Sequence, residues 1–354
     1  MNRSASQRIL FCSHGVSGST LNLRARKLAE GLSRRDWECH VMLQGPPDSS
    51  LTDAKFKVHY FSSSKRQVFT ARRLVRRILP THVHFLNPML AARATVLGER
   101  RHLIIGDWED WHTNPENPSI RNPFQRQADR WFIKNADIVT TCSLSLAQEF
   151  NRRYFRNDVC YIPYASTLGY TGASSISLPS KTFVFMGSIR PHWNHRTILE
   201  AAVLLKAAGV QPSIIMIGDG ADRAPCEQFV RHNRLSNVSF TGRLDDETMM
   251  AHLRSAHALL FPIEDNLLNR SRCPFKVFHY ALARRPIITS AVGEVLQHLG
   301  DRAYYVPTDA QSFAKAILHH LSIPPQDIDY PCNCSSWDDR SQALADALEK
   351  HAIG

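Results

Sequence analysis

The sequence lacks any long apolar run. A membrane-spanning helix needs about 20 apolar residues, and no stretch of about 18 or more is apolar in this 354-residue chain. The apolar run nearest the amino terminus, Ile9–Cys12, is too short for the core of a secretory signal peptide. We therefore expect a cytoplasmic protein without a membrane-spanning segment.

Cysteine pairs with metal-ligand spacing are also missing. The eight cysteines are scattered along the chain, and none forms a Cys-x-x-Cys pair. Cys332 and Cys334 are separated by one residue, a spacing that we interpret as structural or incidental. Several other cysteines lie in apolar, strand-like runs, where a thiol packs as a small apolar group. The cysteine spacing therefore gives no indication of a zinc site.

Positive charge is present in excess, but only in the first half. The formal net charge is +11, and residues 1–170 hold 25 Lys and Arg against 14 Asp and Glu, whereas the remainder holds 18 of each. Such an excess attracts an anionic partner, which could be a lipid surface, a phosphorylated acceptor or nucleic acid. The alternative is a generally basic composition with no specific partner.

Short apolar runs alternate with helical patterns along both halves of the chain, which favours parallel sheets covered by helices on both faces. The expected strands are residues 8–12, 38–43, 57–61, 82–86, 102–105 and 137–142, then 182–186, 213–217, 238–241, 258–262 and 286–290. The clearest helices are expected at 20–33, 65–79, 195–208 and 274–283. Residues 171–180 are rich in Gly, Ser and Pro and are interpreted as a linker.

The fold class that follows is α/β, with two Rossmann-like domains. We expect an amino-terminal domain at 1–170, a carboxy-terminal domain at 171–335, and a last helix at 336–354 that returns to the first domain. Ligands of such sheets bind beyond the carboxyl ends of the strands. The two domains are therefore expected to face each other across one interdomain cleft.

One segment of the second half makes a family recognisable. Residues 213–262 are SIIMIGDGADRAPCEQFVRHNRLSNVSFTGRLDDETMMAHLRSAHALLFP, with a GDG turn after a strand and L-x-N-V-x-F-x-G-R further on. This segment resembles the nucleotide-binding half of glycosyltransferase family 4 (group 1), the retaining enzymes of the GT-B fold. The resemblance continues through 272–283 and 286–290. It is weaker in LRARKLAEGLSRRDWECHVML and NADIVTTCSLSLAQEF of the first half, and in the SWDD of 336–339.

The resemblance implies an activity. It implies a hexosyltransferase that moves a hexose-like sugar from a nucleotide-sugar donor, a UDP- or GDP-sugar, to a cell-envelope, polysaccharide or lipid-linked acceptor. Retention of configuration then needs no protein nucleophile, because the departing phosphate can take the proton of the acceptor. The chain has no Asp-x-Asp pair placed for a metal, and the donor itself is the only small molecule required. We therefore expect no metal and no further cofactor.

Two basic residues are expected to bind the donor diphosphate. Arg272 and Lys276 lie four residues apart at the start of the helix predicted for 274–283, with Pro274 in its first turn. Diphosphates are bound by cations, and charge that grows on the leaving diphosphate can be stabilised by the same cations. Arg272 and Lys276 are therefore catalytic candidates as well as donor-binding ones. The alternative is an exposed basic pair, although such charge opposes the helix dipole there.

The loop after the first strand of the second domain departs from the family pattern. The family usually carries an Arg and a Lys in this loop, and by spacing Ser188 and Trp193 take their places. Gly187, Arg190 and Asn194 belong to the same loop and are expected to contact the donor, with Arg190 as a replacement cation.

His279 is the second departure. Family members generally have two glutamates eight residues apart, of which the second binds the ribose hydroxyls, and here Ser271 and His279 take those positions. A neutral imidazole can hydrogen-bond a hydroxyl, so we expect His279 in the donor site. A buried core histidine is the alternative. Glu264 and Asp265 end the preceding strand and could take over contact with the sugar.

Glycine-rich turns end two neighbouring strands of the second domain. Gly218, Asp219 and Gly220 follow one strand, and Gly242 with Arg243 follows the next. Glycines allow a backbone to approach a ligand closely, so these residues are expected in the donor site. Arg243 could equally be a surface residue.

Polar residues gather after the strand predicted for 102–105. Asp107, Glu109, Asp110 and His112 follow one another closely, a density that is unusual in a plain loop. We expect Asp107 to contact the sugar or the acceptor, with Asp110 as the next candidate, and both are proposed as catalytic. Glu109 and His112 are expected on the acceptor side.

Tryptophans and glycines accompany these polar residues. Trp108 and Trp111 could stack on a sugar, although tryptophan also packs in cores. Gly15 and Gly18 are expected to form a flexible loop on the acceptor side.

The helix predicted for 65–79 is strongly basic. Its arginines could lie near anionic lipid, and each basic residue contributes about 1 kcal/mol at such a surface. This would make the protein peripheral at the inner face of the cell membrane. The alternative is an ordinary Rossmann helix with a solvated basic face. The apolar positions are Val68, Ala71, Val75 and Ile78, and the basic ones are Arg72, Arg73, Arg76 and Arg77.

Two other functions remain open on the sequence alone. The basic first half would suit a glycosyltransferase that modifies nucleic acid, although no alternation of aromatic and basic residues indicates a base-stacking groove. The departures at Ser188, Trp193 and His279 would suit a degenerate, non-catalytic homologue that still binds nucleotide.

Overall fold

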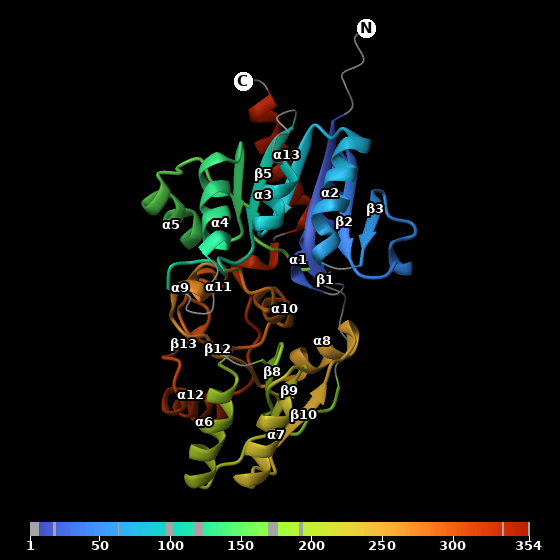
Figure 1. Ribbon diagram of the computed structural model, residues 1–354. Helices are drawn as coiled ribbons and strands as arrows, with labels where there is room; N and C mark the ends of the chain where they lie inside the picture. Colours follow the sequence, from blue (N-terminus) through green and yellow to red (C-terminus); the bar gives the residue numbers. More distant parts are fainter. Residues whose placement is uncertain are drawn as a thin grey trace. The chain divides into compact units, whose positions relative to one another are not determined.

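The chain folds into two compact units. The computed structural model describes residues 7–16, 19–62, 64–96, 102–116, 123–168, 176–190, 194–334 and 336–352. The first unit comprises Met1–Ala165, Arg270–Cys273 and Ser335–Gly354, and the second comprises Ser166–Asn269 and Pro274–Cys334. Figure 1 labels the helices and strands of both.

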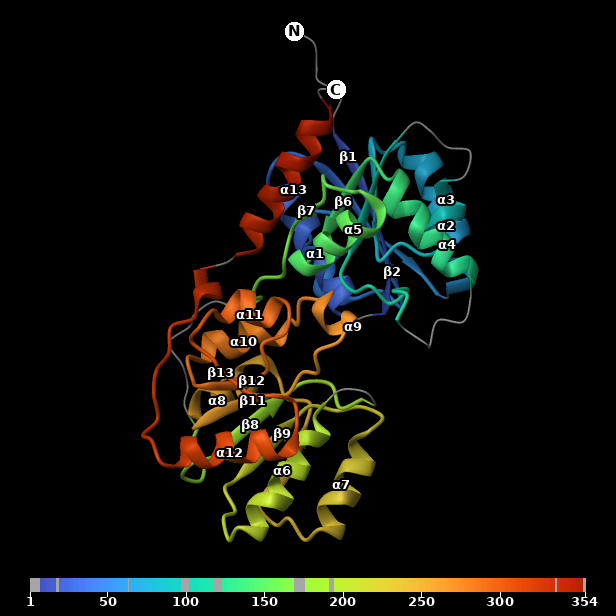
Figure 2. The ribbon, with the colours of Figure 1, turned by 90° about the vertical axis from the view of Figure 1, so that its left-hand side faces the viewer.

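The first unit is built on a seven-stranded parallel sheet in the order β3-β2-β1-β4-β5-β6-β7. Helices α2, α3 and α4 cover one face, and α1 and α13 lie against the other (Figure 2). The strands are β1 (Arg8–Val16), β2 (Glu38–Gln44), β3 (Lys57–Phe61), β4 (His82–Leu86), β5 (Leu103–Trp108), β6 (Ile138–Thr141) and β7 (Cys160–Tyr161). The helices are α1 (Thr20–Ser33), α2 (Ser64–Ile78), α3 (Leu90–Val96), α4 (Pro123–Asn135), α5 (Leu144–Tyr154) and α13 (Trp337–Ala352), with a 3₁₀ turn at Ser49–Leu51.

The last helix, α13, is part of the first unit because it packs on α1. Ser341 of α13 lies so close to Gly31 of α1 that an added Cβ on Gly31 would collide with the serine side chain. At the edge of this contact, Arg35 and Asp338 form an ion pair with Nη1 and Oδ1 3.0 Å apart. The small residue in α1 therefore sets the close approach of the two helices.

The second unit is built on a six-stranded parallel sheet in the order β10-β9-β8-β11-β12-β13. The strands are β8 (Phe183–Met186), β9 (Ile214–Ile217), β10 (Val238–Gly242), β11 (Ala258–Phe261), β12 (Ile287–Thr289) and β13 (Tyr304–Tyr305). The helices are α6 (Arg196–Ala207), α7 (Arg223–His232), α8 (Asp246–Ser255), α9 (Leu267–Arg270), α10 (Lys276–Ala283), α11 (Glu294–Leu299) and α12 (Ala310–Leu321), with a 3₁₀ turn at Pro331–Cys334. The last residue of α9, Arg270, is assigned to the first unit.

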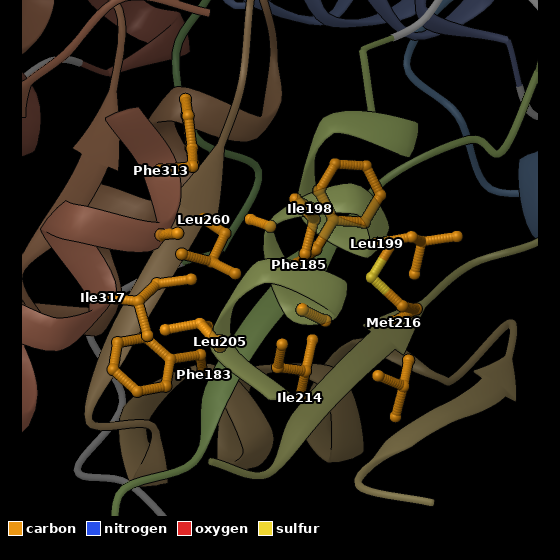
Figure 3. Packing of buried hydrophobic residues seen from close by; sticks show 14 of the residues in the cluster. Phe183, Phe185, Ile198, Leu199, Leu205, Ile214, Met216, Leu260, Phe313 and Ile317 are labelled. Carbon is orange, nitrogen blue, oxygen red and sulfur yellow. The ribbon is translucent and has the colours of Figure 1, made fainter. Parts of the chain in front are cut away.

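A continuous apolar core lies between the second sheet and helices α6 and α12. Side chains of β8, β9 and β11 point into it from the sheet, and Leu205 of α6 and Ile317 of α12 meet them (Figure 3). Their burial is complete or nearly so, and burying side chains of this size stabilises a fold by about 1.5 to 3 kcal/mol each. This core fixes the strands whose carboxyl ends carry the candidate site.

The fold predicted from the sequence is confirmed: both units are α/β, with parallel sheets of Rossmann type. Asp245 immediately precedes α8 and caps it, because its side chain accepts a hydrogen bond from the Thr248 backbone. Among the described residues, no helix combines the length and the apolar character needed to cross a bilayer.

Three local expectations are corrected. Strand β5 continues to Trp108, so Asp107 lies inside the sheet and not in the loop after it. Gly15 lies in β1, which continues to Val16, and not in a flexible loop. Helix α10 begins at Lys276, so Pro274 precedes its first turn, where the proline carbonyl accepts a hydrogen bond from Val277.

Candidate functional site

Four glycines bring three loops of the second unit together. Gly187, Gly218 and Gly242 lie at the carboxyl ends of β8, β9 and β10, and Gly220 lies just beyond Gly218. We call Gly187, Gly218, Gly220 and Gly242 the glycine platform. The Gly187 amide donates to Ile217, and the Gly218 amide donates to Gly242 at 2.8 Å. These bonds hold the three strand ends as one surface.

The platform tolerates no larger residue at its centre. Gly218 has a φ of +131° and Gly242 a φ of +76°, a region that favours glycine. An added Cβ on Gly218 would collide with the carbonyl oxygen of Gly187, and one on Gly220 would collide with the carbonyl oxygen of Ile189. The predicted glycine turns are therefore required by the packing of one loop on another.

A buried ammonium group lies against this platform. Lys276 is the first residue of α10 and is only 8% exposed. Its Nζ lies 4.5 Å from the ring centroid of Phe185 and 4.7 Å from that of Phe261, and an added Cβ on Gly187 would collide with it. Aromatic faces stabilise such a cation. The structure thus places one of the two predicted phosphate-binding cations beside the platform.

Arg272 lies elsewhere than expected. It precedes α10, outside any helix, and belongs to the segment Arg270–Cys273 of the first unit. Burial lowers the pKa of Arg272 there, and the nearby carboxylate of Asp110 opposes this effect. Arg272 and Lys276 therefore do not share one helix face, and the expected role of Arg272 at the diphosphate stays a prediction.

The loop after β8 offers polar groups at the platform. Ser188 and Arg190 are exposed, whereas Trp193 lies outside the described residues. The Asn194 side chain accepts a hydrogen bond of 3.0 Å from the backbone of Glu264, which ties this loop to the end of β11.

The outer turns of the second unit carry further polar side chains. Asp219 accepts from the amide of Gly220 at 2.8 Å and is exposed, as is Arg243. Glu264 and Asp265 line an open hollow of about 530 Å³ beyond the ends of β11 to β13. This hollow is large enough for a sugar, and Ser290, Tyr305 and Thr308 also line it. Their hydroxyl groups are hydrogen-bonded within the protein, Ser290 with Thr308, and Thr308 and Tyr305 with backbone carbonyls.

His279 is a buried neutral imidazole. Burial lowers its pKa to about 4 against a weak opposing effect of Asp246, and its ring lies edge-on to Phe275 with centroids 4.7 Å apart. Its Nε2 has no hydrogen-bond partner among the described residues. A neutral ring with an unmatched nitrogen can bind a ligand hydroxyl, as the sequence suggested. Ser271, its predicted counterpart, is fully buried in the first unit.

In the first unit, Asp107 is the centre of a buried polar network. Its carboxylate accepts two hydrogen bonds from Arg24, at 2.7 and 2.9 Å, and one of 2.7 Å from Thr140. His84 lies 3.1 Å away, and the Asp107 side chain has no exposed surface. Although burial opposes ionisation, Arg24 and His84 hold the pKa of Asp107 well below its usual range. These bonds occupy both oxygens of Asp107, so its carboxylate is not available for the predicted contact with a sugar or an acceptor.

Glu109, Asp110 and His112 follow Asp107 on the loop after β5. The backbone amides of Glu109 and Asp110 both donate to the side chain of Asn87, at 2.8 and 3.3 Å. Glu109 accepts from Thr20, and burial together with the charge of Asp110 raises the pKa of Glu109 to about 7. Glu109 is therefore an enclosed carboxyl group that can carry a proton near neutral pH.

Asp110 and His112 form a pair at a small cavity. Asp110 Oδ2 and His112 Nε2 are 3.4 Å apart, and the hydrogen bond that His112 donates to Asp110 raises the pKa of His112. Burial opposes ionisation of Asp110, but His112 and then Arg272 hold its pKa low. The cavity, of about 40 Å³, is also lined by His14 and Asn87. Such a pair can accept hydrogen bonds from a hydroxyl group or give it one.

Trp108 at the end of β5 and Trp111 in the loop after it pack in the core and do not stack on a ligand. Trp108 and Trp111 are each 1% exposed, and both donate to Asp129, at 2.8 and 2.9 Å. Both rings stand edge-on to Phe150. Sugar stacking is therefore corrected to core packing for these two residues.

The residues that sequence analysis missed are those that orient others. Arg24 on α1 and His84 on β4 reach Asp107 in β5 from distant parts of the chain, and Asn87 after β4 reaches the loop that follows β5. Asn87 has a φ of +45°, unusual for a residue other than glycine, and Asn-Pro in the sequence was a signal for a turn there. Gly15 donates to Ser13 Oγ at 3.2 Å, and Gly18 lies outside the described residues.

Comparison with known proteins gives the family. Residues 180–322 match the family described as "Glycosyl transferases group 1", and residues 19–165 match the family described as "Glycosyl transferase 4-like domain". The chain belongs to the group 1 glycosyl transferases. The family inferred from the GDG turn and the segment around it is thereby confirmed.

Individual relatives of this glycosyl transferase are distant. The D-rhamnosyltransferase WbpZ of Pseudomonas aeruginosa is 24% identical over 152 residues, which are 42% of this chain and 38% of that protein. A glycosyltransferase from Rickettsia africae has the same fold, with a TM-score of 0.69 at 12% identity over 99% of this chain and 98% of that one. The Anabaena protein HepE, solved with UDP and glucose, superposes with a TM-score of 0.66 at 14% identity over 98% of each chain.

Proposed function

We propose that this chain transfers a hexose-like sugar from a nucleotide-sugar donor to a saccharide or lipid-linked acceptor of the cell envelope, with retention of configuration. Membership of the group 1 family supports transfer. The similarity to a D-rhamnosyltransferase supports a hexose-like sugar, since rhamnose is a deoxyhexose. The UDP and glucose held by HepE support a UDP-sugar donor, and a GDP-sugar is the alternative.

One observation carries the donor half of the proposal. The Lys276 ammonium group lies against Gly187, at the carboxyl ends of parallel strands, where ligands of such sheets bind. Because the neighbouring residues are glycines, a diphosphate can approach the backbone closely and reach the cation. In the proposal, Lys276 binds the diphosphate and stabilises the charge that it gains when the sugar leaves.

The rest of the donor lies around the platform. We assign the ribose to His279 and the sugar to Glu264 at the hollow beyond β11. Gly218, Asp219, Gly242 and Arg243 then border the base. Gly187, Ser188, Arg190, Asn194, Pro274 and Arg272 complete the proposed donor-binding set.

The acceptor half is assigned to the loop after β5. Asp110 and His112 offer a charged, hydrogen-bonding pair to acceptor hydroxyls, and Glu109 lies next to them. Asp107 positions this loop through its network and does not touch the acceptor. In a retaining transfer the departing phosphate takes the acceptor proton, so we assign no protein nucleophile and require no metal.

Helix α2 supplies a surface for an anionic membrane. Phe69 is 77% exposed and, with Arg72, Arg73, Arg76 and Arg77, lines a shallow hollow of the first unit. An exposed aromatic ring among four guanidinium groups suits the boundary between phosphate head groups and acyl chains. We propose that α2 brings the enzyme to the inner face of the membrane, where a lipid-linked acceptor would lie.

Thermal stabilisation by nucleotides tests the donor half. The protein would be heated with UDP, GDP, dTDP or ADP, alongside Arg272→Ala. A ligand at 100 times its Kd stabilises by about 2.7 kcal/mol, which raises Tm by several degrees. We expect either UDP or GDP to raise the Tm of the wild type. The increase should be smaller in Arg272→Ala if Arg272 binds the diphosphate. No shift with any of the four nucleotides would contradict the donor site and favour a degenerate homologue.

A further inference from the structure

Three side chains that can bind a metal meet between the first turns of α6 and α7. His195 immediately precedes α6, Asp222 immediately precedes α7, and Cys226 lies one turn into α7. Their ligand atoms all lie within 4.8 Å of one another. His195 Nε2 is 2.9 Å from Asp222 Oδ2, and Cys226 Sγ is 4.0 Å from the same oxygen. None of the three takes part in the donor or acceptor site described above.

The orientation of Asp222 is not explained by helix capping. Aspartate is favoured at this position because its carboxylate normally accepts a backbone amide of the first turn. Here the side chain makes no such bond and turns to His195 on the neighbouring helix. The carboxylate is therefore directed at the histidine and the cysteine.

The cluster is closed on the protein side and open to solvent on the other. His195 is 1% exposed and Cys226 3%, whereas the Asp222 side chain is 26% exposed. Metal sites with three protein ligands commonly keep one position for water. The exposed edge of Asp222 provides the entry route and the place for that water.

We propose that His195, Asp222 and Cys226 bind a zinc-like divalent cation. Imidazole nitrogen, carboxylate oxygen and thiolate sulfur are the ligands that zinc takes in proteins. Tetrahedral zinc places such ligand atoms about 3.3 to 3.6 Å apart, so separations of 2.9 and 4.0 Å need to change by about 0.5 Å only. On binding, the Cys226 thiol releases its proton to solvent, and the hydrogen on His195 Nε2 is replaced by one on Nδ1.

The environment predicts modest affinity. His195 Nδ1 has no hydrogen-bond partner among the described residues, so its N–H would lack the acceptor that usually supports a metal-bound imidazole. Missing support of this kind weakens binding by roughly 10- to 100-fold. We therefore expect a site that fills and empties with the metal concentration, and not a permanent structural zinc.

Occupancy would be felt at the glycine platform. The amide of Asp222 donates to the carbonyl of Ile189, and the amide of Ile189 donates to the carbonyl of Asp219, both at 3.0 Å. A cation that fixes Asp222 therefore also fixes the loop after β8. The expectation that metal changes the affinity for nucleotide rests on the proposed function. The proposal of the metal site itself is independent of it.

Cobalt(II) titration of metal-stripped protein tests the site. Cobalt replaces zinc, and a cobalt–thiolate bond gives a charge-transfer band in the near ultraviolet. We expect a band that saturates at one cobalt per chain and is removed by zinc. It should be absent in Cys226→Ser and retained in Cys160→Ser, a control at a half-buried cysteine outside the cluster.

A second variant keeps the test decisive if Cys226→Ser does not fold, as judged by circular dichroism. Asp222→Asn preserves shape and removes the anionic ligand, so cobalt affinity should fall at least 10-fold. No cobalt band in wild-type protein, a band that persists in Cys226→Ser, or unchanged affinity in Asp222→Asn would each overturn the proposal.

Discussion

Replacing Lys276 by methionine removes the charge beside the glycine platform. The methionine side chain keeps a similar length and apolar stem, and its sulfur packs well against the rings of Phe185 and Phe261. Lys276 is only 8% exposed, so the methionine stays enclosed by the same apolar groups. We expect Lys276→Met to fold, which its circular dichroism and Tm would check.

Nucleotide binding should respond very differently. A hydrogen bond to a charged group contributes about 1.5 to 3 kcal/mol, so losing one such bond to the diphosphate weakens binding by roughly 10- to 150-fold. Isothermal titration calorimetry with the nucleotide that stabilises the wild type would measure this change. Lys315→Met serves as the control, because Lys315 is exposed on α12 and the substitution changes the net charge equally.

Either of two results would exclude a contact between Lys276 and the diphosphate. If Lys276→Met keeps its Tm and binds the nucleotide within about threefold of wild type, the ammonium group does not contact the diphosphate. If Lys315→Met loses affinity as much as Lys276→Met, the effect is one of net charge and not of the platform.

Four further outcomes are expected. Gly218→Ala should abolish nucleotide stabilisation in calorimetry, because its Cβ collides with the facing carbonyl of the platform. Asp107→Asn should cost about 3 to 5 kcal/mol in denaturant unfolding, the usual effect of breaking a buried ion pair. Burial lowers the pKa of His279 to about 4 in the folded chain, so below about pH 6.5 the unfolded chain binds more protons than the folded one. The free energy of unfolding should therefore fall as the pH is lowered from 6.5 to 4. It should fall less in His279→Gln. Arg72→Gln with Arg76→Gln should weaken sedimentation with anionic vesicles by about 1 kcal/mol per arginine.

Each of these outcomes has a result that contradicts it. Normal nucleotide binding by Gly218→Ala would show that the platform loops can separate without loss. If Asp107→Asn lowers the free energy of unfolding by less than about 1 kcal/mol, the network around Asp107 is not held by charge. Equal pH dependence of wild-type and His279→Gln protein would assign the titration to other groups. Vesicle binding that is insensitive to both arginines, or equal for neutral vesicles, would remove α2 from the membrane proposal.

The fold could be predicted from the sequence because the alternation of strands and helices is visible in local sequence patterns. Helix α1 was predicted with the bounds that the structure has, since Ser19 caps it and its apolar positions repeat every three or four residues. The end of β5 was placed too early because a dense run of polar residues begins at Asp107. The Asp107 carboxylate stays in the sheet because Arg24 neutralises it, and a pairing between residues 83 positions apart is not visible in local sequence.

The site could be predicted only in part, for the same reason. The glycine turns after β9 and β10 were evident, but their contact with Gly187 is tertiary and has no local signal. Four-residue spacing placed Arg272 and Lys276 on one helix face, whereas α10 begins only at Lys276. Tryptophans beside carboxylates suggested that Trp108 and Trp111 stack on a sugar. Both are instead buried against Phe150 in the core.

We propose that the chain transfers a sugar from a nucleotide donor held at the glycine platform. The most direct measurement is the release of nucleoside diphosphate from a panel of UDP- and GDP-sugars, by wild-type protein and by folded Lys276→Met. We expect release from one donor, accelerated by a saccharide or lipid-linked acceptor, and at least a 10-fold slower rate in the variant. Release at equal rates by both proteins, or no release from any donor by the wild type with acceptors present, would contradict the proposal.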